Sequence, residues 1–200
     1  MSENLAAHDK SIREPLFEYL EEVYGKIRIL EEKRTGKARA DVVMVLPGAV
    51  CGIEIKSDRD TYARLESQVK YYDMYYDYNI VAVGSSHAMH IEEHVPAWWG
   101  IITLEEVEGT LDFYMLRRPE PNPKVKAARK ITLLWRPELA RLQEMNHLPA
   151  YREKSKRFVQ KKILEKVPEE VLWPQVSELL FQRDYTDLIA KISAYRKKRN

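Results

Sequence analysis

The sequence predicts an α/β fold followed by a helical C-terminal region. Strand-like apolar runs alternate with segments of helical periodicity along residues 1–118, a pattern typical of a sheet covered by helices. The stretch 119–123 carries three prolines in five positions, which prohibits regular structure there. Residues 124–200 show apolar residues at helical spacing. We therefore expect a core at 1–118, a linker at 119–123, and a helical extension at 124–200 packed on or beside the core.

The first elements expected are a helix and a strand. Ser11 caps a helix that runs to about Tyr24. The apolar stripe of this helix consists of Ile12, Leu16, Tyr19, Leu20 and Val23. Gly25 ends the helix, because glycine readily takes the left-handed backbone conformation that follows a last turn. Residues 26–33 follow as a strand, and Thr35-Gly36 as a turn into the next strand.

Residues 39–56 form a predicted hairpin, because two β-rich runs flank Pro47-Gly48. A four-residue loop places Asp41 opposite Lys56 and diagonal to Glu54. A two-residue loop places Asp41 directly opposite Glu54, although proline at its first position fits the favoured hairpin turns poorly. In both cases the three side chains share one face of the sheet. A three-residue loop moves Asp41 to the other face and destroys the group.

The remaining elements continue the alternation. A helix is expected over residues 61–76, a central strand over 79–84, a surface helix around 87–94 and a strand over 100–104. In the extension, Pro137 suits the first turn of a helix. Further helices are expected over residues 155–166, 172–181 and 188–195, with a disordered terminus at 196–199.

The two halves of the chain carry opposite net charge. Residues 1–123 hold 14 Lys+Arg and 22 Asp+Glu, a net charge of −8, whereas residues 124–200 hold 19 and 9, a net charge of +10. The sum is the +2 of the whole chain. Such asymmetry indicates a region that faces nucleic acid, although solubilising lysines account for it equally well. In the basic half, Lys161 and Lys162 are candidate nucleic-acid contacts.

Composition also restricts the cellular setting. The single cysteine, Cys51, excludes an intramolecular disulfide and suits a reducing compartment, so a cytoplasmic protein is expected. No apolar run approaches the length that spans a membrane, and the N-terminus lacks the pattern of a signal peptide. We therefore expect no membrane association.

Asp41, Glu54 and Lys56 are the most informative residues of the sequence. Two carboxylates brought close repel each other, and a hard divalent cation relieves the repulsion by taking oxygen ligands from both. An ammonium group beside that cation can hold an attacking water or stabilise charge on a phosphate. An exposed hairpin face with a cross-strand Asp–Lys pair is the structural alternative. The three residues interrupt strands that are otherwise apolar on both faces, which favours a functional site.

These residues resemble the signature of the PD-(D/E)XK nuclease superfamily, the metal-dependent fold of restriction enzymes and many repair nucleases. The match comprises residues 39–41 (Arg-Ala-Asp) and 53–58 (Ile-Glu-Ile-Lys-Ser-Asp), with Ala40 in place of the name-giving proline. Gln68 and Tyr72 are similar to the Gln-xxx-Tyr element of the branch that contains the RecB nuclease domain. Segments similar to a small, mostly uncharacterised bacterial and phage family extend the resemblance over about residues 10–145; they are residues 95–101 and 133–139.

The resemblance implies a restriction-endonuclease-like core, in which helices flank a mixed central sheet. It also implies Mg²⁺ or Mn²⁺ as the cofactor, bound by Asp41, Glu54 and the backbone carbonyl of Ile55. In this hypothesis Lys56 positions or activates the attacking water, and Gln68 orients the metal ligands. The expected reaction is hydrolysis of phosphodiester bonds, with DNA as the favoured substrate, in repair, recombination or phage and mobile-element defence.

Other residues are candidates for the same site. Arg64 and Tyr72 lie on one helical stripe with Gln68, and we expect both to contact nucleic acid. The superfamily often adds an acidic metal ligand from the first helix or the first strand. Glu31, on the strand, is the first candidate here and Glu18, on the helix, is the second.

The alternative function is a catalytically weak or inactive module that keeps this fold and binds nucleic acid or a protein. Metal affinity separates the active nuclease from the inactive module, because a site that has lost catalysis should not bind manganese through Asp41 and Glu54 together. The sequence leaves open whether the protein is a monomer or a homodimer. It also leaves open whether the substrate is duplex, single-stranded, branched or damaged DNA, or RNA.

Overall fold

The structure is a computed structural model that describes residues 9–35, 38–58 and 60–183. The chain forms two compact units, Met1–Lys126 and Ala127–Asn200, each with its own packing. The proline-rich stretch expected as a linker is attached to the first unit. There the main-chain N–H of Asn122 donates to the carbonyl of Asp77 at 2.8 Å, and that of Lys126 donates to the carbonyl of Met74 at 3.0 Å.

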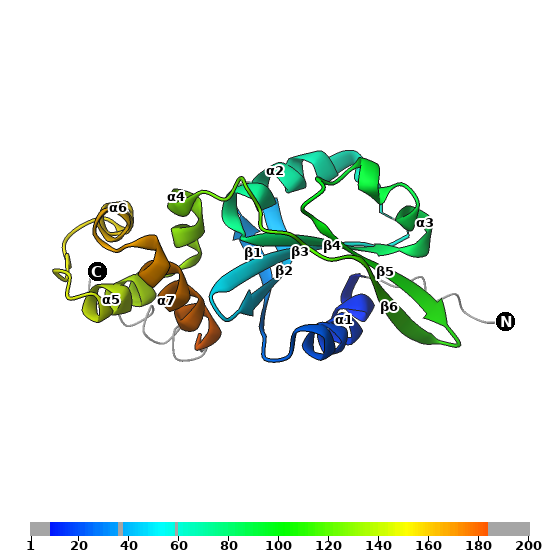
Figure 1. The fold of residues 1–200 in the computed structure, drawn as a ribbon, viewed down its shortest axis with the longest axis horizontal. Coiled ribbons are helices and arrows are strands. Elements are labelled where there is room, and N and C mark those ends of the chain that lie inside the picture. The colour runs from blue at the N-terminus through cyan, green and yellow to red at the C-terminus, as the bar shows by residue number, and fades with distance from the viewer. Residues whose placement is uncertain (1–8, 36–37, 59, 184–200) are drawn as a thin grey trace, which may run out of the picture. The chain divides into compact units, whose positions relative to one another are not determined.

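The first unit is a six-stranded sheet flanked by helices, so the predicted α/β fold with a mixed central sheet is confirmed (Figure 1). The strands follow the order of the sequence; β4 pairs in parallel with β3 and with β5, and the other three pairings are antiparallel. The strands are β1 (Arg28–Thr35), β2 (Ala38–Leu46), β3 (Ala49–Lys56), β4 (Tyr78–Gly84), β5 (Gly100–Val107) and β6 (Thr110–Arg117). The helices are α1 (Asp9–Tyr24), η1 (Tyr62–Arg64), α2 (Leu65–Tyr75), α3 (Ser85–Ala88) and η2 (Ile91–Glu93).

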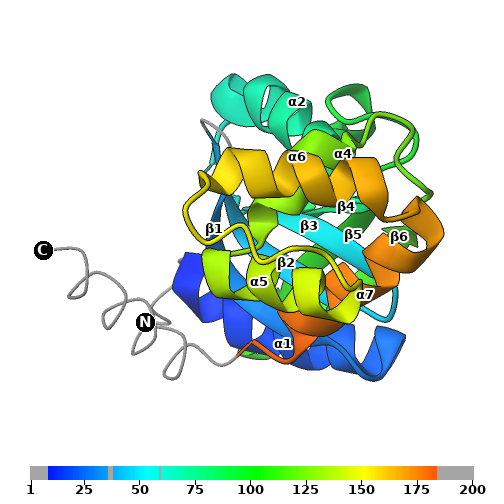
Figure 2. The same ribbon diagram turned by 90° about the vertical axis from the view of Figure 1, so that its left-hand side faces the viewer.

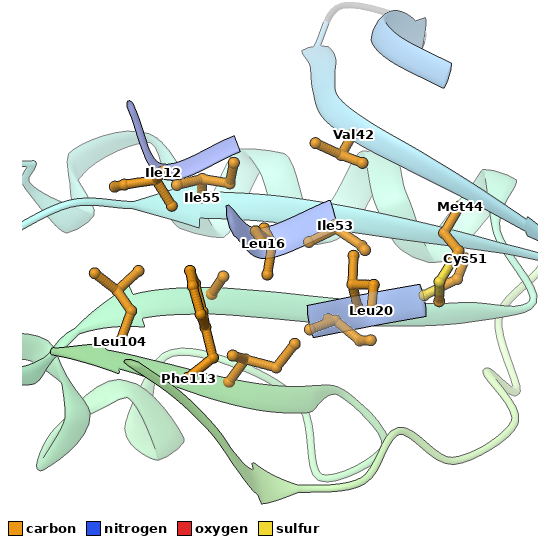
Figure 3. Close-up of a cluster of buried hydrophobic side chains, with 13 residues drawn as sticks. Ile12, Leu16, Leu20, Val42, Met44, Cys51, Ile53, Ile55, Leu104 and Phe113 are labelled. Atoms are coloured by element: carbon orange, nitrogen blue, oxygen red, sulfur yellow. The ribbon is translucent and has the colours of Figure 1, made fainter. Parts of the chain in front are cut away.

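Helix α1 covers one face of the sheet (Figure 1). Its apolar stripe, Ile12, Leu16 and Leu20, is fully buried against side chains from strands β2 to β6 (Figure 3). Those strand residues include Val42, Met44, Cys51, Ile53, Ile55 and Phe113. Because alternate residues of a strand face opposite sides, the odd-numbered residues of β3 face α1 and the even-numbered ones face the other way.

Helix α2 covers the opposite face, and Gly52 of β3 makes its close approach possible (Figure 1). A Cβ atom on Gly52 would overlap the ring of Tyr76 and would lie 2.8 Å from the ring of Tyr72. Both rings are fully buried, so neither can move aside freely. The small residue therefore sets how closely α2 packs above the even-numbered residues of β3, which include Glu54 and Lys56.

Replacing Gly52 with alanine is expected to lower the free energy of unfolding by about 1–3 kcal/mol, the usual cost of an overpacked core. The added methyl group must displace the Tyr72 or Tyr76 ring from its buried position. Thermal unfolding followed by circular dichroism measures the effect. A melting temperature equal to that of the wild type would contradict this packing of α2 on β3.

The turn between β2 and β3 has two residues, Pro47 and Gly48, because Leu46 pairs with Ala49. Of the alternatives open from the sequence, the four-residue loop is therefore wrong. Gly48 has φ +80°. A fixed proline φ near −65° followed by a positive φ matches the central residues of a type II turn, which accepts proline at its first central position. The poor fit of proline to the primed hairpin turns is thus avoided.

Two regions differ from the prediction. Strand β6 was not expected, because its outer residues are exposed at the sheet edge and its apolar pattern is weak. The turn before it carries positive φ at Glu108 (53°) and Gly109 (80°), as hairpin turns of the primed type require. The single surface helix expected over residues 87–94 is instead two short pieces, α3 and η2.

The second unit consists of helices, as expected (Figure 2). They are α4 (Ala127–Lys130), η3 (Ile131–Leu133), α5 (Arg136–Met145), α6 (Lys156–Lys166) and α7 (Glu169–Phe181). Pro137 stands in the first turn of α5, and the hydroxyl of Ser155 caps α6 by accepting the Phe158 N–H at 3.2 Å. The expected elements at 188–195 and 196–199 lie outside the described residues. Within the described residues, no helix has the length and apolar character needed to cross a membrane.

Candidate active site

The site begins where strands β2 and β3 separate. Their pairing ends at Val42 and Ile53, although β2 continues along β1 and β3 continues along β4. Beyond that point the N–H of Ile55 is bound by a carboxylate, because Oδ2 of Asp41 accepts it at 3.0 Å. In an antiparallel ladder the N–H and C=O of one residue face the same neighbour, so the Ile55 carbonyl also faces the gap beside Asp41.

Glu54 lies at the centre of a buried hydrogen-bond network. Its Oε1 accepts from Nζ of Lys56 at 2.7 Å and from the side-chain amide of Gln68. Its Oε2 accepts from the hydroxyl of Tyr72 at 2.7 Å. Glu54 is 1% exposed and Lys56 is 4% exposed, so the two charges form an ion pair removed from water. Burial of such a pair is costly unless further hydrogen bonds satisfy it, which Gln68 and Tyr72 do here.

Tyr72 joins the two acidic residues. Its hydroxyl donates to Glu54 and accepts the main-chain N–H of Asp41 at 3.3 Å. Burial raises the pKa of Tyr72 well above its ordinary value, and the charges of Glu54 and Asp41 raise it further. The phenol therefore stays protonated, and its single proton is directed to the carboxylate of Glu54. Tyr72 thus fixes the position of the Asp41 main chain relative to Glu54.

The donor set of this group fits a hard cation. Asp41 is half-buried at the gap, while Glu54 is enclosed. The side-chain oxygen of Gln68, next to Glu54, is buried without a hydrogen-bond partner in the described part of the chain. Described residues form no cluster of three or more His, Cys, Asp or Glu side chains suited to a metal. Two carboxylates with amide or carbonyl oxygens are nevertheless the usual protein contribution to an Mg²⁺ site, where water and phosphate complete the shell.

The structure places Asp41, Glu54 and Lys56 together at one end of the hairpin, and Gln68, which the family resemblance suggested, contacts Glu54 there. The two-residue turn extends the register so that Asp41 falls opposite Glu54. Tyr72 does not fit its predicted nucleic-acid contact, because it is fully buried. Its role is instead to hold Glu54 and the main chain of Asp41.

Glu31 does not join the group. It pairs with Val42 across β1 and β2, and directly paired residues share a face, so Glu31 lies on the α1 side of the sheet. There its carboxylate binds the guanidinium of Arg13 at 3.1 Å. The prediction of Glu31 as a metal ligand is therefore not supported by its position. Glu18, the second acidic candidate, lines a pocket between α1 and the β5–β6 hairpin instead.

The candidate nucleic-acid contacts lie in different places. Arg64 is exposed at the last position of η1, immediately before α2, on the stripe that continues into Gln68. Lys161 and Lys162 stand on α6 in the second unit. Both form ion pairs with Glu165, at 3.6 Å and 2.7 Å. One carboxylate on the same helix therefore balances one of their two positive charges.

Arg13 was missed by sequence reasoning. This α1 residue is 6% exposed, and its guanidinium contacts both Glu31 and, at 3.4 Å, the carbonyl of Asp41. It holds the main chain of Asp41 from the α1 side, while Tyr72 holds it from the α2 side. In the sequence Arg13 is one charged residue among several in an amphipathic helix, and no local pattern shows that its side chain is buried.

Replacing Tyr72 with phenylalanine tests how the site is held together. We expect the free energy of unfolding to fall by about 1–3 kcal/mol, because the Asp41 N–H and one oxygen of Glu54 lose their partner. Loss of such an orienting contact lowers metal affinity by about 10–100-fold, so the Mn²⁺ affinity should also fall. Tyr71→Phe, a neighbour on the same helix, is the matched control. Equal effects of the two substitutions would contradict the assigned role of Tyr72.

Comparisons with known proteins gave one match over nearly the full length. A family model described as "Bacteriophage P4 protein cII" matches residues 4–197. A search of the curated proteins gave no match. Among solved structures, a protein of unknown function from Silicibacter pomeroyi is 24% identical over 57% of this chain and 72% of its own, with a TM-score of 0.41. SfsA of Pyrococcus furiosus, solved in complex with Ca²⁺, is 12% identical over 56% of this chain and 63% of its own, with a TM-score of 0.36.

Proposed function

This chain belongs to the bacteriophage P4 protein cII family, and we propose that it is a metal-dependent nuclease that hydrolyses phosphodiester bonds, with DNA as the favoured substrate. One observation carries the proposal. The hydroxyl of Tyr72 accepts the main-chain N–H of Asp41 on β2 and donates to the carboxylate of Glu54 on β3. Lys56 and Gln68 donate to the same Glu54 carboxylate. A structural ion pair alone does not need a second carboxylate or an unpartnered amide oxygen beside it.

The residues suited to hold Mg²⁺ or Mn²⁺ are Asp41 and Glu54, together with the carbonyl of Ile55. Gln68 offers its unpartnered oxygen to a water bound in the same place. When bound, the cation would supply positive charge to the phosphate that is attacked and lower the pKa of water. The chain supplies the fixed positions of the oxygen donors, because strand β3 and helix α2 are both rigid parts of the core.

Lys56 has a defined role in this proposal. Its ammonium group donates one hydrogen bond to Glu54 and keeps two further donors for water or a phosphate oxygen. It can therefore orient the attacking water and stabilise the charge that develops on the phosphate. In the same proposal Arg64, which is exposed just before α2, contacts the phosphate backbone beside the scissile bond.

A second candidate function is a module that binds nucleic acid or a partner protein without cleaving it. One observation favours it: the ammonium of Lys56 already occupies Glu54, together with two neutral donors. A non-catalytic protein that keeps the Glu54–Lys56 ion pair to stabilise its fold would show the same hydrogen bonds. Binding of a divalent cation by Asp41 and Glu54 separates the two functions.

The test of the proposed function is a cleavage assay on labelled linear, nicked, branched and single-stranded DNA, and on RNA. Each substrate is incubated with the protein in Mg²⁺, Mn²⁺ or EDTA. We expect cleavage of at least one DNA substrate with either cation and none with EDTA. Binding without cleavage of any substrate in either cation would favour the non-catalytic module.

A further inference from the structure

The connection between α5 and α6 in the second unit is held rigidly from within. The guanidinium of Arg136 donates to the carbonyls of Tyr151 and Lys154, both at 2.9 Å. The side-chain amide of Gln143 donates to the carbonyl of Pro149. Within this connection, His147 and Tyr151 have positive φ of 53° and 43°. Such conformations are costly and persist only where the surroundings enforce them, often at functional sites.

This rigid connection presents cations that lack acidic partners. Arg152, Lys154 and Arg157 are exposed, and none of them forms an ion pair with a described residue. Lys161 and Lys162, one turn further along α6, are both paired with Glu165. At the start of α6 these cations therefore have no ion-pair partner among the described residues, whereas farther along the helix two lysines share the carboxylate of Glu165.

The position of these charges is itself unfavourable for the isolated protein. The N-terminal end of a helix carries partial positive charge, so basic side chains in its first turn are destabilising and acidic ones are preferred. The first turn of α6 has Lys156 and Arg157 and no acidic residue. An anion bound at this place would relieve the repulsion among the side chains and the helix end together.

Two aromatic rings lie beside Lys154. Tyr151 and Phe158 pack edge to face at 5.3 Å, and the ammonium of Lys154 lies 5.7 Å from the centroid of the Phe158 ring. The ammonium of Lys162 lies 5.8 Å from the same centroid, so the ring contact is common to both groups of lysines. The contact limits the freedom of the Lys154 side chain, so less entropy is lost when it meets a ligand. Arg152, Lys154 and Arg157 together form an exposed cationic surface, which we call the α5–α6 surface.

We propose that the α5–α6 surface binds the phosphate backbone of nucleic acid, and that it, and not the Lys161–Lys162 pair, is the main electrostatic contact of the second unit. Several unpaired cations at the end of one helix suit a polyanion with regularly spaced phosphates better than a single small anion. The proposal rests on the proposed function only for the nature of the partner. Its contacts are independent of the metal and of any cleavage.

The test compares two double variants that remove the same charge from the same unit. One is Lys154→Gln with Arg157→Gln, and the control is Lys161→Gln with Lys162→Gln. Binding of a short fluorescein-labelled DNA duplex is measured by anisotropy in EDTA over a range of NaCl concentrations, so no cleavage takes place. Each lost phosphate contact reduces the slope of log K against log salt by about 0.9. We expect a reduction of about two for the first variant and little change for the control.

Equal slopes for the two variants, or a larger loss in the control, would overturn the α5–α6 surface. Stronger binding of the wild type to phosphatidylserine vesicles than to DNA would overturn nucleic acid as its partner. Absence of cleavage in Mg²⁺, with the expected reduction of the salt slope in EDTA, would contradict the proposed nuclease activity and would still support DNA binding by the α5–α6 surface. Cleavage by the wild type, with an unchanged salt slope in the Lys154→Gln, Arg157→Gln variant, would contradict only the proposed role of the α5–α6 surface.

Discussion

Glu54→Gln is expected to lower the free energy of unfolding by about 3–5 kcal/mol and to abolish cleavage, because it leaves the Lys56 ammonium buried without a counter-charge. The shape of the side chain is preserved, so the effect reports charge and not a cavity. Lys56, Gln68 and Tyr72 all donate hydrogen bonds to the two oxygens of Glu54. A glutamine side chain has only one acceptor oxygen, so it cannot accept from all three in the same way. Denaturant unfolding in EDTA measures the stability without any contribution from a bound cation.

The double variant Glu54→Gln with Lys56→Met separates the two consequences. Removing the ammonium removes the unpaired charge, so we expect much of the lost stability to return while cleavage remains absent. A double variant as unstable as Glu54→Gln alone would show that the loss arises from the hydrogen bonds to Gln68 and Tyr72. If Glu54→Gln cleaved DNA like the wild type, Glu54 would have no place in the active site.

Asp41→Asn is expected to reduce cleavage by at least on the order of a hundredfold while the fold is kept. Asparagine still has an oxygen that can accept the Ile55 N–H, so the contact that joins β2 to β3 survives. What is lost is the negative charge that a divalent cation requires. Cleavage rates under single-turnover conditions, with the melting temperature measured alongside, give both quantities.

Asp77→Asn is the matched control for this substitution. Oδ2 of Asp77 accepts the main-chain N–H of Val50 at 2.8 Å, so an Asp side chain also binds the main chain of β3 at the opposite end of the strand. Its replacement should leave cleavage unchanged. A comparable loss of cleavage in the two variants would mean that Asp41 acts through the structure of the sheet. Unchanged cleavage in Asp41→Asn would remove it from the catalytic residues.

Much of the fold could be predicted because the signals were local. The helix that buries Ile12, Leu16 and Leu20 follows from their spacing, and Ser155 marks the start of α6 by its capping chemistry. Strand β6 could not be recognised, because an edge strand buries few residues and its pattern is correspondingly weak. The length of the β2–β3 turn was open because proline excludes the commonest hairpin turns but permits type II.

The grouping of Asp41, Glu54 and Lys56 could be predicted because strand periodicity places them on one face of the sheet. Gln68 was added by the family resemblance, because helix periodicity alone fits an ordinary exposed face equally well. Periodicity does not show how deeply each side chain is buried. Tyr72 lies on the same helical stripe as the exposed Arg64, yet it is fully buried, and the stripe passes from solvent to core within two turns. The face of Glu31 depended on the register between β1 and β2, which the sequence does not specify.

Titration of the metal-free protein with Mn²⁺ tests the central claim most directly, because it does not depend on the right substrate. Calorimetry or electron paramagnetic resonance of the wild type, Asp41→Asn and Asp77→Asn gives the affinity and the number of sites. We predict Mn²⁺ binding at the Asp41–Glu54 site in the wild type and in Asp77→Asn, and its loss in Asp41→Asn. Absence of Mn²⁺ binding in the wild type, or equal affinity in Asp41→Asn, would contradict the assignment of Asp41 and Glu54 as a metal site.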